Sequence, residues 1–224
     1  MKATTVKIKA RTVPVNLEDG RNLEEFIAHV ARVSNPTNQN NHLTAPKLIT
    51  YLQKHGHWSP FECVNILLEV NTTRDIGRQL LRHRSFSFQE FSQRYAATET
   101  ISELREARLQ DTKNRQNSLE TADEEMIRWW NDAQSEVVDL AFTKYDAAIK
   151  KGIALEQARV LLPEGLTNTR IYVNGNIRSY IHYIIVRTHK STQKEHRDIA
   201  FMMAKAIEPE FPSIMKFVSP DYTE

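Results

Sequence analysis

A thirteen-residue stretch, RHRSFSFQEFSQR from Arg82 to Arg94, holds many hydrogen-bonding side chains. Guanidinium groups present fixed forks of donors that match phosphate oxygens, and histidine can stack on or hydrogen-bond to a ring. Serine hydroxyls add small donors, while the Glu90 carboxylate can accept from an imide or a hydroxyl. Together these groups indicate a site for a phosphorylated molecule that contains a ring. For Arg82 to Arg84 taken alone, a solvated basic loop is the competing interpretation.

The stretch has to act without the usual glycine-rich phosphate loops. The chain has 6 glycines among 224 residues, and neither G-x-x-x-x-G-K nor G-x-G-x-x-G occurs. Side chains and helix ends must therefore hold any bound nucleotide.

Histidine spacing raises the question of a metal site. No H-E-x-x-H pattern or close Cys/His set accompanies the histidines, and a spacing of seven on one helix separates side chains by about two turns. We therefore predict packing or hydrogen-bonding roles and no metal for His55, His57, His182, His189 and His196.

Composition limits the class of protein. A chain of 224 residues with 40% hydrophobic content predicts a single domain spanning 1–224. A net charge of +2 argues against general attraction to nucleic acid or anionic membrane. The single cysteine, Cys63, fits a reducing compartment, and we predict that it packs inside a strand and is not a nucleophile. Without a signal-like apolar run or a membrane span, we expect a soluble, cytoplasmic protein.

The first half of the chain predicts a helix, a strand and a second helix. Thr44 is placed to cap a helix with apolar positions at Leu48, Tyr51 and Leu52 and with Gly56 beyond its end. The segment FECVNILLEV then alternates, with one face formed by Val64, Ile66, Leu68 and Val70, which is typical of a half-buried strand. A short helix follows from Thr73 to about Arg82 and carries Gln79.

The second half is mainly helical. We predict a loop or a partly ordered helix from Thr98 to Ser118, and an amphipathic helix from Glu120 to Lys150 with its apolar stripe at Met126, Trp130, Ala133, Val137, Leu140 and Ala141. A short helix precedes Pro163, and TRIYVNGN predicts a strand that stops at a glycine-containing turn. Two helices follow, with stripes at Ile177, Tyr180, Ile181, Ile184 and Ile185 and at Ile199, Met202, Met203, Ala206 and Ile207. The fold class is α+β, with a mostly antiparallel sheet packed against several helices.

Written as R-H-R-x-x-S-x-x-x-x-S-x-R, the stretch from Arg82 to Arg94 resembles the signature of the flavin-dependent thymidylate synthases. Upstream, HGHWSPFE resembles the family's His-x-Ser/Thr-Pro-Phe-Glu segment. Downstream, EQARVLLPEGLTNT and NGNIRSYIHYIIVRT resemble its Gln-Ala-Arg segment and its Asn-x-Arg helix. These blocks keep the family's order from Leu43 to Ile207.

The resemblance implies an enzyme that converts dUMP to dTMP. FAD would carry hydride, NADPH would reduce it, and methylenetetrahydrofolate would donate the one-carbon unit. It also implies a homotetramer with shared active sites. The competing hypothesis is a nucleic-acid-binding domain that uses the arginine-rich stretch 82–94, against which the near-neutral charge argues.

Matching positions imply roles for individual residues. The expected flavin contacts are Ser59, Glu62, Arg82, His83, Arg84, Asn176, Arg178 and His182. The expected dUMP contacts are Gln79, Glu90, Ser92, Arg94, Arg159 and Arg187. Three residues are the catalytic candidates: Arg187, which would polarise the uracil carbonyl, His57, which would lie where folate or nicotinamide approaches the flavin, and Ser92.

Two positions need separate treatment. Ser92 has no evident base in the sequence to activate it, so we expect it to orient dUMP and not to form a covalent bond. Some relatives carry a histidine four residues after the arginine that matches Arg187. This chain has Ser191 there, with His189 out of register, which leaves open what supplies that flavin contact.

Overall fold

The computed structural model describes residues 4–98 and 103–222, and these pack as two compact units. The larger unit comprises Val6–Val70, His83–Phe88 and Tyr172–Glu224, and the smaller unit comprises Met1–Thr5, Asn71–Arg82 and Gln89–Ile171. The stretch from Arg82 to Arg94 therefore belongs partly to each unit.

A sheet with the strand order β1-β2-β6-β3 contributes residues to both units. Its strands are β1 (Thr5–Arg11), β2 (Asn65–Thr73), β6 (Asn168–Asn176) and β3 (Ser87–Glu90). Thr12 bonds Asn65 at one end of the β1–β2 pair and Thr5 bonds Asn71 at the other, so these strands run antiparallel. The α+β class with a mostly antiparallel sheet and several helices is confirmed.

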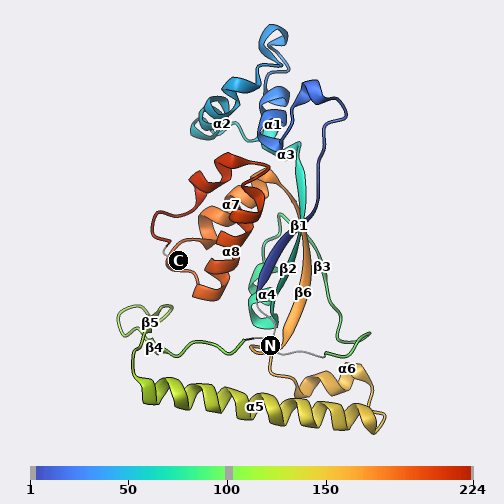
Figure 1. The fold of residues 1–224 in the computed structure, drawn as a ribbon, viewed down its shortest axis with the longest axis vertical. Coiled ribbons are helices and arrows are strands. Elements are labelled where there is room, and N and C mark those ends of the chain that lie inside the picture. Colours follow the sequence, from blue (N-terminus) through green and yellow to red (C-terminus); the bar gives the residue numbers. More distant parts are fainter. Residues whose placement is uncertain (1–3, 99–102, 223–224) are drawn as a thin grey trace. The chain divides into compact units, whose positions relative to one another are not determined.

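The larger unit holds most of the buried apolar side chains. Its helices are α1 (Leu23–Ala31), α2 (Ala45–Lys54), α3 (Ser59–Glu62), α7 (Ile177–Arg187) and α8 (Lys194–Ile207), with 3-10 turns at Leu17–Asp19, Pro36–Asn38, His42–Thr44 and Pro212–Phe217. Helix α7 packs on α8, and α1 packs on α2 and α3 (Figure 1). The predicted strand face is confirmed, because Val64, Ile66, Leu68 and Val70 are completely buried.

Aromatic side chains pack closely at the centre of this core. Phe86 packs its ring on Tyr180 and Tyr183, with centroids 4.8 and 5.7 Å apart. Gly175 lies against the same ring, and a Cβ at this position would come within 2.7 Å of Phe86 Cε1. Residue 175 must therefore be glycine because a close approach demands it, not because the chain turns there.

The smaller unit is built around one long helix. Its elements are α4 (Arg74–Leu80), β4 (Arg108–Gln110), β5 (Ser118–Glu120), α5 (Glu124–Lys150) and α6 (Leu155–Ala158), with a 3-10 turn at Arg159–Leu161. Asp123 caps α5 by accepting from the backbone N–H groups of Glu125 and Met126. Helix α5 packs on α6 and on the following 3-10 turn.

Several sequence expectations about these elements are wrong. The segment from Thr98 to Ser118, predicted as a loop or a partly ordered helix, contains β4 and the first residue of β5, and these strands form an antiparallel hairpin with Leu109 opposite Leu119; positions 99–102 of that segment lie outside the described residues. Strand β6 runs through Gly175 into α7 without a turn. Thr44 precedes α2, but it makes no side-chain cap bond and its hydroxyl accepts from Arg32.

Two predictions about burial also fail. Cys63 is exposed and ends α3, with its Sγ 3.7 Å from the Ser59 carbonyl, so it is not a packed strand residue. The predicted apolar stripe of α5 is not its buried face. The buried residues of that helix are Gln134, Val138 and Tyr145, whereas Met126, Val137 and Leu140 are exposed.

Candidate active site

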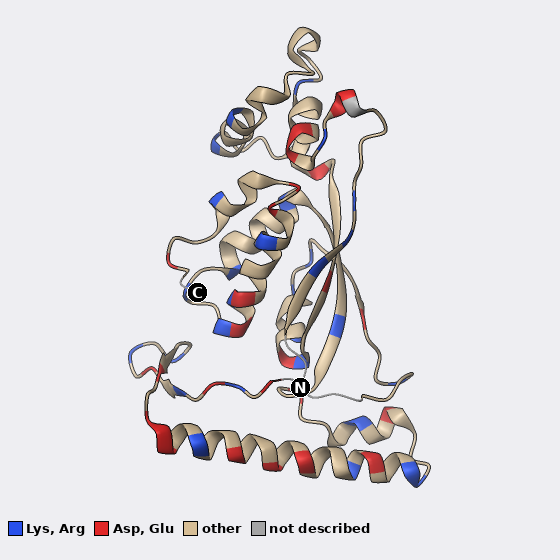
Figure 2. Ribbon diagram, in the orientation of Figure 1, with Lys and Arg blue, Asp and Glu red and all other residues tan. Residues whose placement is uncertain are grey.

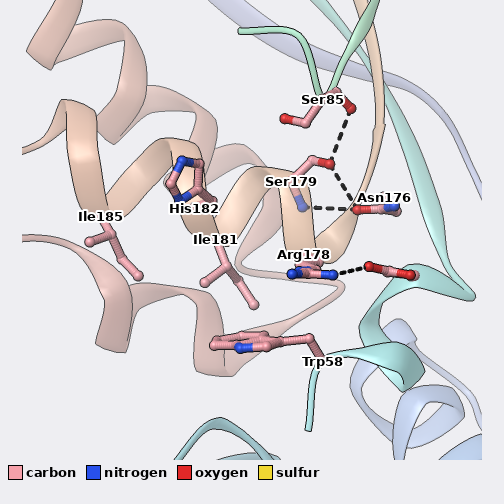
Figure 3. Close-up of a pocket in the computed structure, with 9 residues that line it drawn as sticks. Trp58, Ser85, Asn176, Arg178, Ser179, Ile181, His182 and Ile185 are labelled. Atoms are coloured by element: carbon pink, nitrogen blue, oxygen red, sulfur yellow. Dashed lines mark hydrogen bonds and ion pairs between the residues drawn. The ribbon is translucent and has the colours of Figure 1, made fainter. Parts of the chain in front are cut away.

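A cavity of about 640 Å³ opens in the larger unit (Figure 3). This volume is typical of sites for small molecules and cofactors, which occupy roughly 300–1,000 Å³. Its lining combines apolar, hydroxyl and charged side chains: Trp58, Glu62, Ser85, Asn176, Arg178, Ser179, Ile181, His182 and Ile185.

The first turn of α7 forms one wall of the cavity. Asn176 caps the helix, because its Oδ1 accepts from the Ser179 backbone N–H at 2.9 Å. The Ser179 hydroxyl lies 2.9 Å from the same oxygen and 3.1 Å from the Ser85 carbonyl. These contacts tie the segment that follows Arg84 to the N-terminus of α7, where unpaired N–H groups and the helix dipole favour an anion.

One face of α7 continues this wall. Arg178, Ile181, His182 and Ile185 follow the i, i+3, i+4, i+7 spacing that places side chains on one side of a helix. The Arg178 guanidinium pairs with the Glu62 carboxylate of α3, and both side chains remain accessible to solvent. Trp58 lines the same cavity as this pair, and Figure 3 shows Trp58 and Arg178 there. The cavity therefore offers a cation, a carboxylate and flat apolar surface together.

Arg187, at the end of α7, is not among the lining residues. Its Nε donates to His83 Nε2 at 2.8 Å. Burial, then the charges of Arg187 and His182, lower the pKa of His83 to about 4. Neutral His83 can therefore accept this bond at physiological pH.

Glu90 is anchored inside the smaller unit. Its Oε1 accepts from the Thr169 hydroxyl at 2.8 Å and from the buried Arg74 at 3.5 Å. Arg74 also pairs with Glu164. These two donors fix the direction of the Glu90 carboxylate.

Ser92 and Arg94 follow Glu90 on a turn of the smaller unit. The Ser92 Oγ accepts from the Arg94 backbone N–H at 3.3 Å. The Arg94 Nε lies 3.6 Å from the Glu156 carboxylate, and both side chains are more than half exposed. Arg159 donates from its Nε to the Glu156 carbonyl at 3.3 Å. Two of the arginines predicted to contact dUMP thus converge on one acidic residue.

The remaining predicted residues are spread over both units. His57, Ser59, Arg82 and Arg84 are exposed, and Gln79 is half-buried on α4. Of the predicted flavin contacts, the cavity brings together Glu62, Asn176, Arg178 and His182. Ser59 begins α3, three residues before Glu62, and His83 and Arg84 immediately precede the lining residue Ser85.

Comparison with known proteins places this geometry in a family. The model for the thymidylate synthase complementing protein family matches residues 17–213. The chain is 48% identical over 212 residues to a probable flavin-dependent thymidylate synthase of Paramecium bursaria Chlorella virus 1, covering 95% of this chain and 97% of the viral protein. It is also 48% identical over 211 residues to the flavin-dependent thymidylate synthase of a Synechocystis strain, covering 93% and 96% of the two chains. The chain belongs to the flavin-dependent thymidylate synthases.

A solved structure supports the fold of this flavin-dependent thymidylate synthase. A UMP/dUMP methylase, PolB from Streptomyces cacaoi, bound with 5-Br dUMP, superposes with a TM-score of 0.79 at 24% identity, covering 97% of this chain and 96% of the methylase. At this identity the likeness establishes the arrangement of strands and helices.

The cavity suits the flavin that the family name implies. Trp58, Ile181 and Ile185 supply surface for a flat ring system, and Arg178 and the N-terminus of α7 supply positive charge for a diphosphate. Glu62 can accept from a hydroxyl. The types and positions of these donors therefore fit FAD.

The sequence interpretation did not identify several of these residues. Trp58, Ser85, Ser179, Ile181 and Ile185 line the cavity, although none was a candidate. The helical spacing of Ile181 and Ile185 from Arg178 was a usable signal, but both had been assigned to the core. Ile181 is indeed buried, whereas the side chain of Ile185 is 46% exposed.

The competing hypothesis of a nucleic-acid-binding domain finds no support. Nothing in the comparisons favours a nucleic-acid-binding domain, and Figure 2 shows acidic residues interspersed with basic ones along α5, without a continuous basic stripe. Within residues 4–98 and 103–222, no cluster of three or more His, Cys, Asp or Glu could hold a metal ion. In the same part of the chain, no helix is both long and apolar enough to span a membrane.

Proposed function

We propose that this flavin-dependent thymidylate synthase methylates dUMP to dTMP, with NADPH as reductant and methylenetetrahydrofolate as one-carbon donor. The observation that carries the proposal is the 48% identity, over nearly the whole of both chains, to the Synechocystis enzyme. Bound FAD supplies the hydride-transfer chemistry, and the side chains bind, orient and polarise.

The larger unit is proposed to hold FAD. Arg178 and the α7 N-terminus would bind its phosphates, and Glu62 and Asn176 would hold polar groups. The other proposed contacts in this unit are Ser59, His83, Arg84 and His182. Arg82, which is grouped with the smaller unit, is a further proposed flavin contact. Support comes from the cavity, which already contains four of the predicted flavin residues. His57, which is exposed, would contact the folate or nicotinamide co-substrate.

The nucleotide is proposed to bind through five residues of the smaller unit of one chain and Arg187 of a second chain. Arg94 and Arg159 suit the phosphate, because guanidinium groups bind phosphate oxygens in bidentate pairs. Gln79 and Glu90 suit the edge of the uracil ring. Arg187 would polarise a uracil carbonyl, which makes the adjacent ring carbon easier to attack.

Ser92 is proposed to orient the nucleotide and not to attack it. In the structure the Ser92 hydroxyl oxygen accepts from the Arg94 backbone N–H. Among the described residues, no side chain that could act as a base hydrogen-bonds to this hydroxyl. Ser92→Ala should therefore retain measurable activity. Mass-spectrometric detection of a dUMP adduct on Ser92 would contradict this role.

We also propose a homotetramer with shared active sites, in which Arg94 and Arg187 acting on one dUMP come from different chains. Support comes from α5, where Met126, Trp129, Val137 and Leu140 are 39, 65, 53 and 61% exposed. Such large apolar side chains along one helix suit burial against a second copy of the chain.

Co-expression tests the shared site. Arg94→Ala and Arg187→Ala should each be nearly inactive alone, whereas mixed assemblies should regain part of the activity because some sites receive both intact arginines. Wild-type chain mixed with either variant controls for assembly. Mixed tetramers without recovered activity would reject the shared site.

Two broader expectations stay proposals. We propose that residues 1–224 act as one domain, supported by a family match that spans segments of both compact units. We propose a cytoplasmic location, because the single cysteine, Cys63, is free and fits a reducing compartment.

A reconstituted assay tests the function. Purified, FAD-loaded protein should convert dUMP to dTMP only when reduced nicotinamide and methylenetetrahydrofolate are both present. Omitting either co-substrate is the control. Absence of dTMP from flavin-loaded protein in the complete mixture would contradict the proposal.

A further inference from the structure

A hydrogen bond within the protein orients the side chain of Arg187. Its Nε donates to His83 Nε2 at 2.8 Å, and the arginine side chain is partly buried. A ring nitrogen accepts such a bond only when it carries no proton, so neutral His83 must hold its proton on Nδ1. The contact thus sets both the charge and the tautomer of His83.

Packed rings hold His83 in this orientation. Its ring meets that of Tyr183 edge to face, with centroids 4.7 Å apart at 81°. Tyr183 is fully buried, and its ring lies 5.7 Å from that of His196, which is also fully buried. Since cores resist movement of close-packed side chains, turning His83 away from Arg187 would displace rings from both α7 and α8.

The same surroundings keep the imidazole neutral. Burial and the charges of Arg187 and His182 lower the pKa of His83 to about 4. Burial, with Arg187 and His83 nearby, lowers the pKa of His196 to about 3. Neither ring therefore repels the guanidinium at neutral pH.

We propose that His83 is a positioning residue that aims the Arg187 guanidinium at the nucleotide. A guanidinium is planar, so holding Nε fixes the direction of both terminal NH₂ groups and reduces the orientational freedom lost when dUMP binds. The inference rests on the proposed role of Arg187 in dUMP binding. It gives His83 a role that acts through arginine, in addition to the flavin contact expected from its motif.

A double-mutant cycle of dUMP binding tests this coupling. Binding would be measured by calorimetry at saturating FAD for wild type, His83→Asn, Arg187→Ala and the double variant. Because the His83–Arg187 bond acts on dUMP only through Arg187, His83→Asn should weaken dUMP binding about tenfold in the wild-type background, the lower end of the loss for a bond to a charged group. In the Arg187→Ala background the same substitution should have almost no effect.

His83→Gln is the matched control. The longer glutamine side chain carries its oxygen close to the position of Nε2, whereas asparagine stops short of it. Glutamine should therefore restore most of the dUMP affinity. If the His83→Gln variant binds dUMP no more tightly than the His83→Asn variant, the proposal is overturned.

The outcomes separate this inference from the proposed function. If wild type fails to bind dUMP, the proposed function is contradicted and the inference falls with it. If wild type binds but the two substitutions act additively, only the inference is overturned.

A direct measurement on wild type follows the Arg187 guanidinium itself. In nitrogen–proton correlation spectra, the Nε–H of Arg187 should be protected from exchange with water, and Arg187→Lys assigns the signal. Exchange as fast as that of the exposed Arg82 and Arg84 would overturn the proposal.

Discussion

The proposed flavin residues of the larger unit stand on a packed core, whereas the proposed nucleotide residues of the smaller unit are held largely by hydrogen bonds and ion pairs. In the larger unit, Asn176, Arg178 and His182 lie on α7, whose inner face buries Tyr180 and Tyr183 completely. In the smaller unit, Arg94 pairs with an exposed carboxylate of Glu156.

This difference predicts how each unit should respond to its ligand. Packing fixes a backbone and its side chains whether or not a ligand is bound, so the larger unit offers a preformed site. An exposed ion pair stabilises by only about 0–1 kcal/mol, so a phosphate can readily take the place of Glu156 on Arg94. We therefore expect little adjustment around the flavin and more around the nucleotide.

The largest effect should come from removing one arginine of each unit. Arg178→Ala should weaken FAD binding by about 10- to 100-fold and leave a folded, poorly coloured protein, because a charge-assisted bond contributes about 1.5–3 kcal/mol. Arg94→Ala should retain flavin and lose dUMP affinity by a similar factor. Flavin absorbance measures FAD occupancy and calorimetry measures dUMP affinity in both variants. Equal loss of flavin in the two variants would contradict the assignment of FAD and dUMP to different units.

A pair of glycine substitutions compares the packing of the two units. Gly175→Ala would push a methyl group into the Phe86 ring, so we expect a loss of about 1–3 kcal/mol in unfolding free energy. Gly77→Ala, on α4, meets the Ile171 Cδ1 at 3.0 Å, but that methyl group can move and alanine favours the helix by about 1 kcal/mol. Urea unfolding should show a clear loss for the first variant and a change within about 1 kcal/mol for the second. Equal losses would contradict a more rigid larger unit.

Buried histidines should make the larger unit sensitive to acid. The pKa values of His83 and His196 fall to about 4 and about 3, and the titratable or charged groups facing them are Arg187, His182 and Tyr183. The unfolded chain, with histidine pKa near 6.5, binds more protons than the folded chain below that value. Stability should be complete above about pH 6.5 and fall as the pH drops toward 4. His196→Gln should reduce this dependence in pH-dependent unfolding, and an unchanged slope would contradict it.

The smallest effect concerns the carboxylate that pairs with Arg94. Glu156→Gln removes an exposed charge that competes with phosphate, so dUMP should bind up to about five-fold more tightly, in line with the modest contribution of surface pairs. Glu195→Gln, on α8, is the matched control and should leave dUMP affinity unchanged. Weaker dUMP binding by Glu156→Gln would show that the carboxylate supports the nucleotide site.

The sequence predicted elements well where one local pattern decided the structure. The alternation of Val64, Ile66, Leu68 and Val70 identified a strand because one face of it is buried. Gly175 misled because glycine serves both turns and close approaches, and only the position of Phe86, far away in the chain, distinguishes the two. On α5 a periodic stripe located the helix but not the face that the isolated chain buries.

The candidate site shows the same limit. Motif positions indicated Glu62, Asn176, Arg178 and His182, which the cavity brings together. The cluster of His83, Tyr183 and His196 was not predictable, because its rings come from three separate parts of the chain and carry no common spacing. Local periodicity reveals which side of a helix is apolar, but not which distant side chain will meet it.

Hydrogen–deuterium exchange with the two ligands added one after the other tests the division between the units most directly. FAD should protect amides in α3 and in the first turns of α7, and dUMP added afterwards should protect 90–94 and 156–159, where packing is weaker and ordering on binding is greater. Protection by dUMP confined to α3 and the first turns of α7, with 90–94 and 156–159 unchanged, would contradict the account.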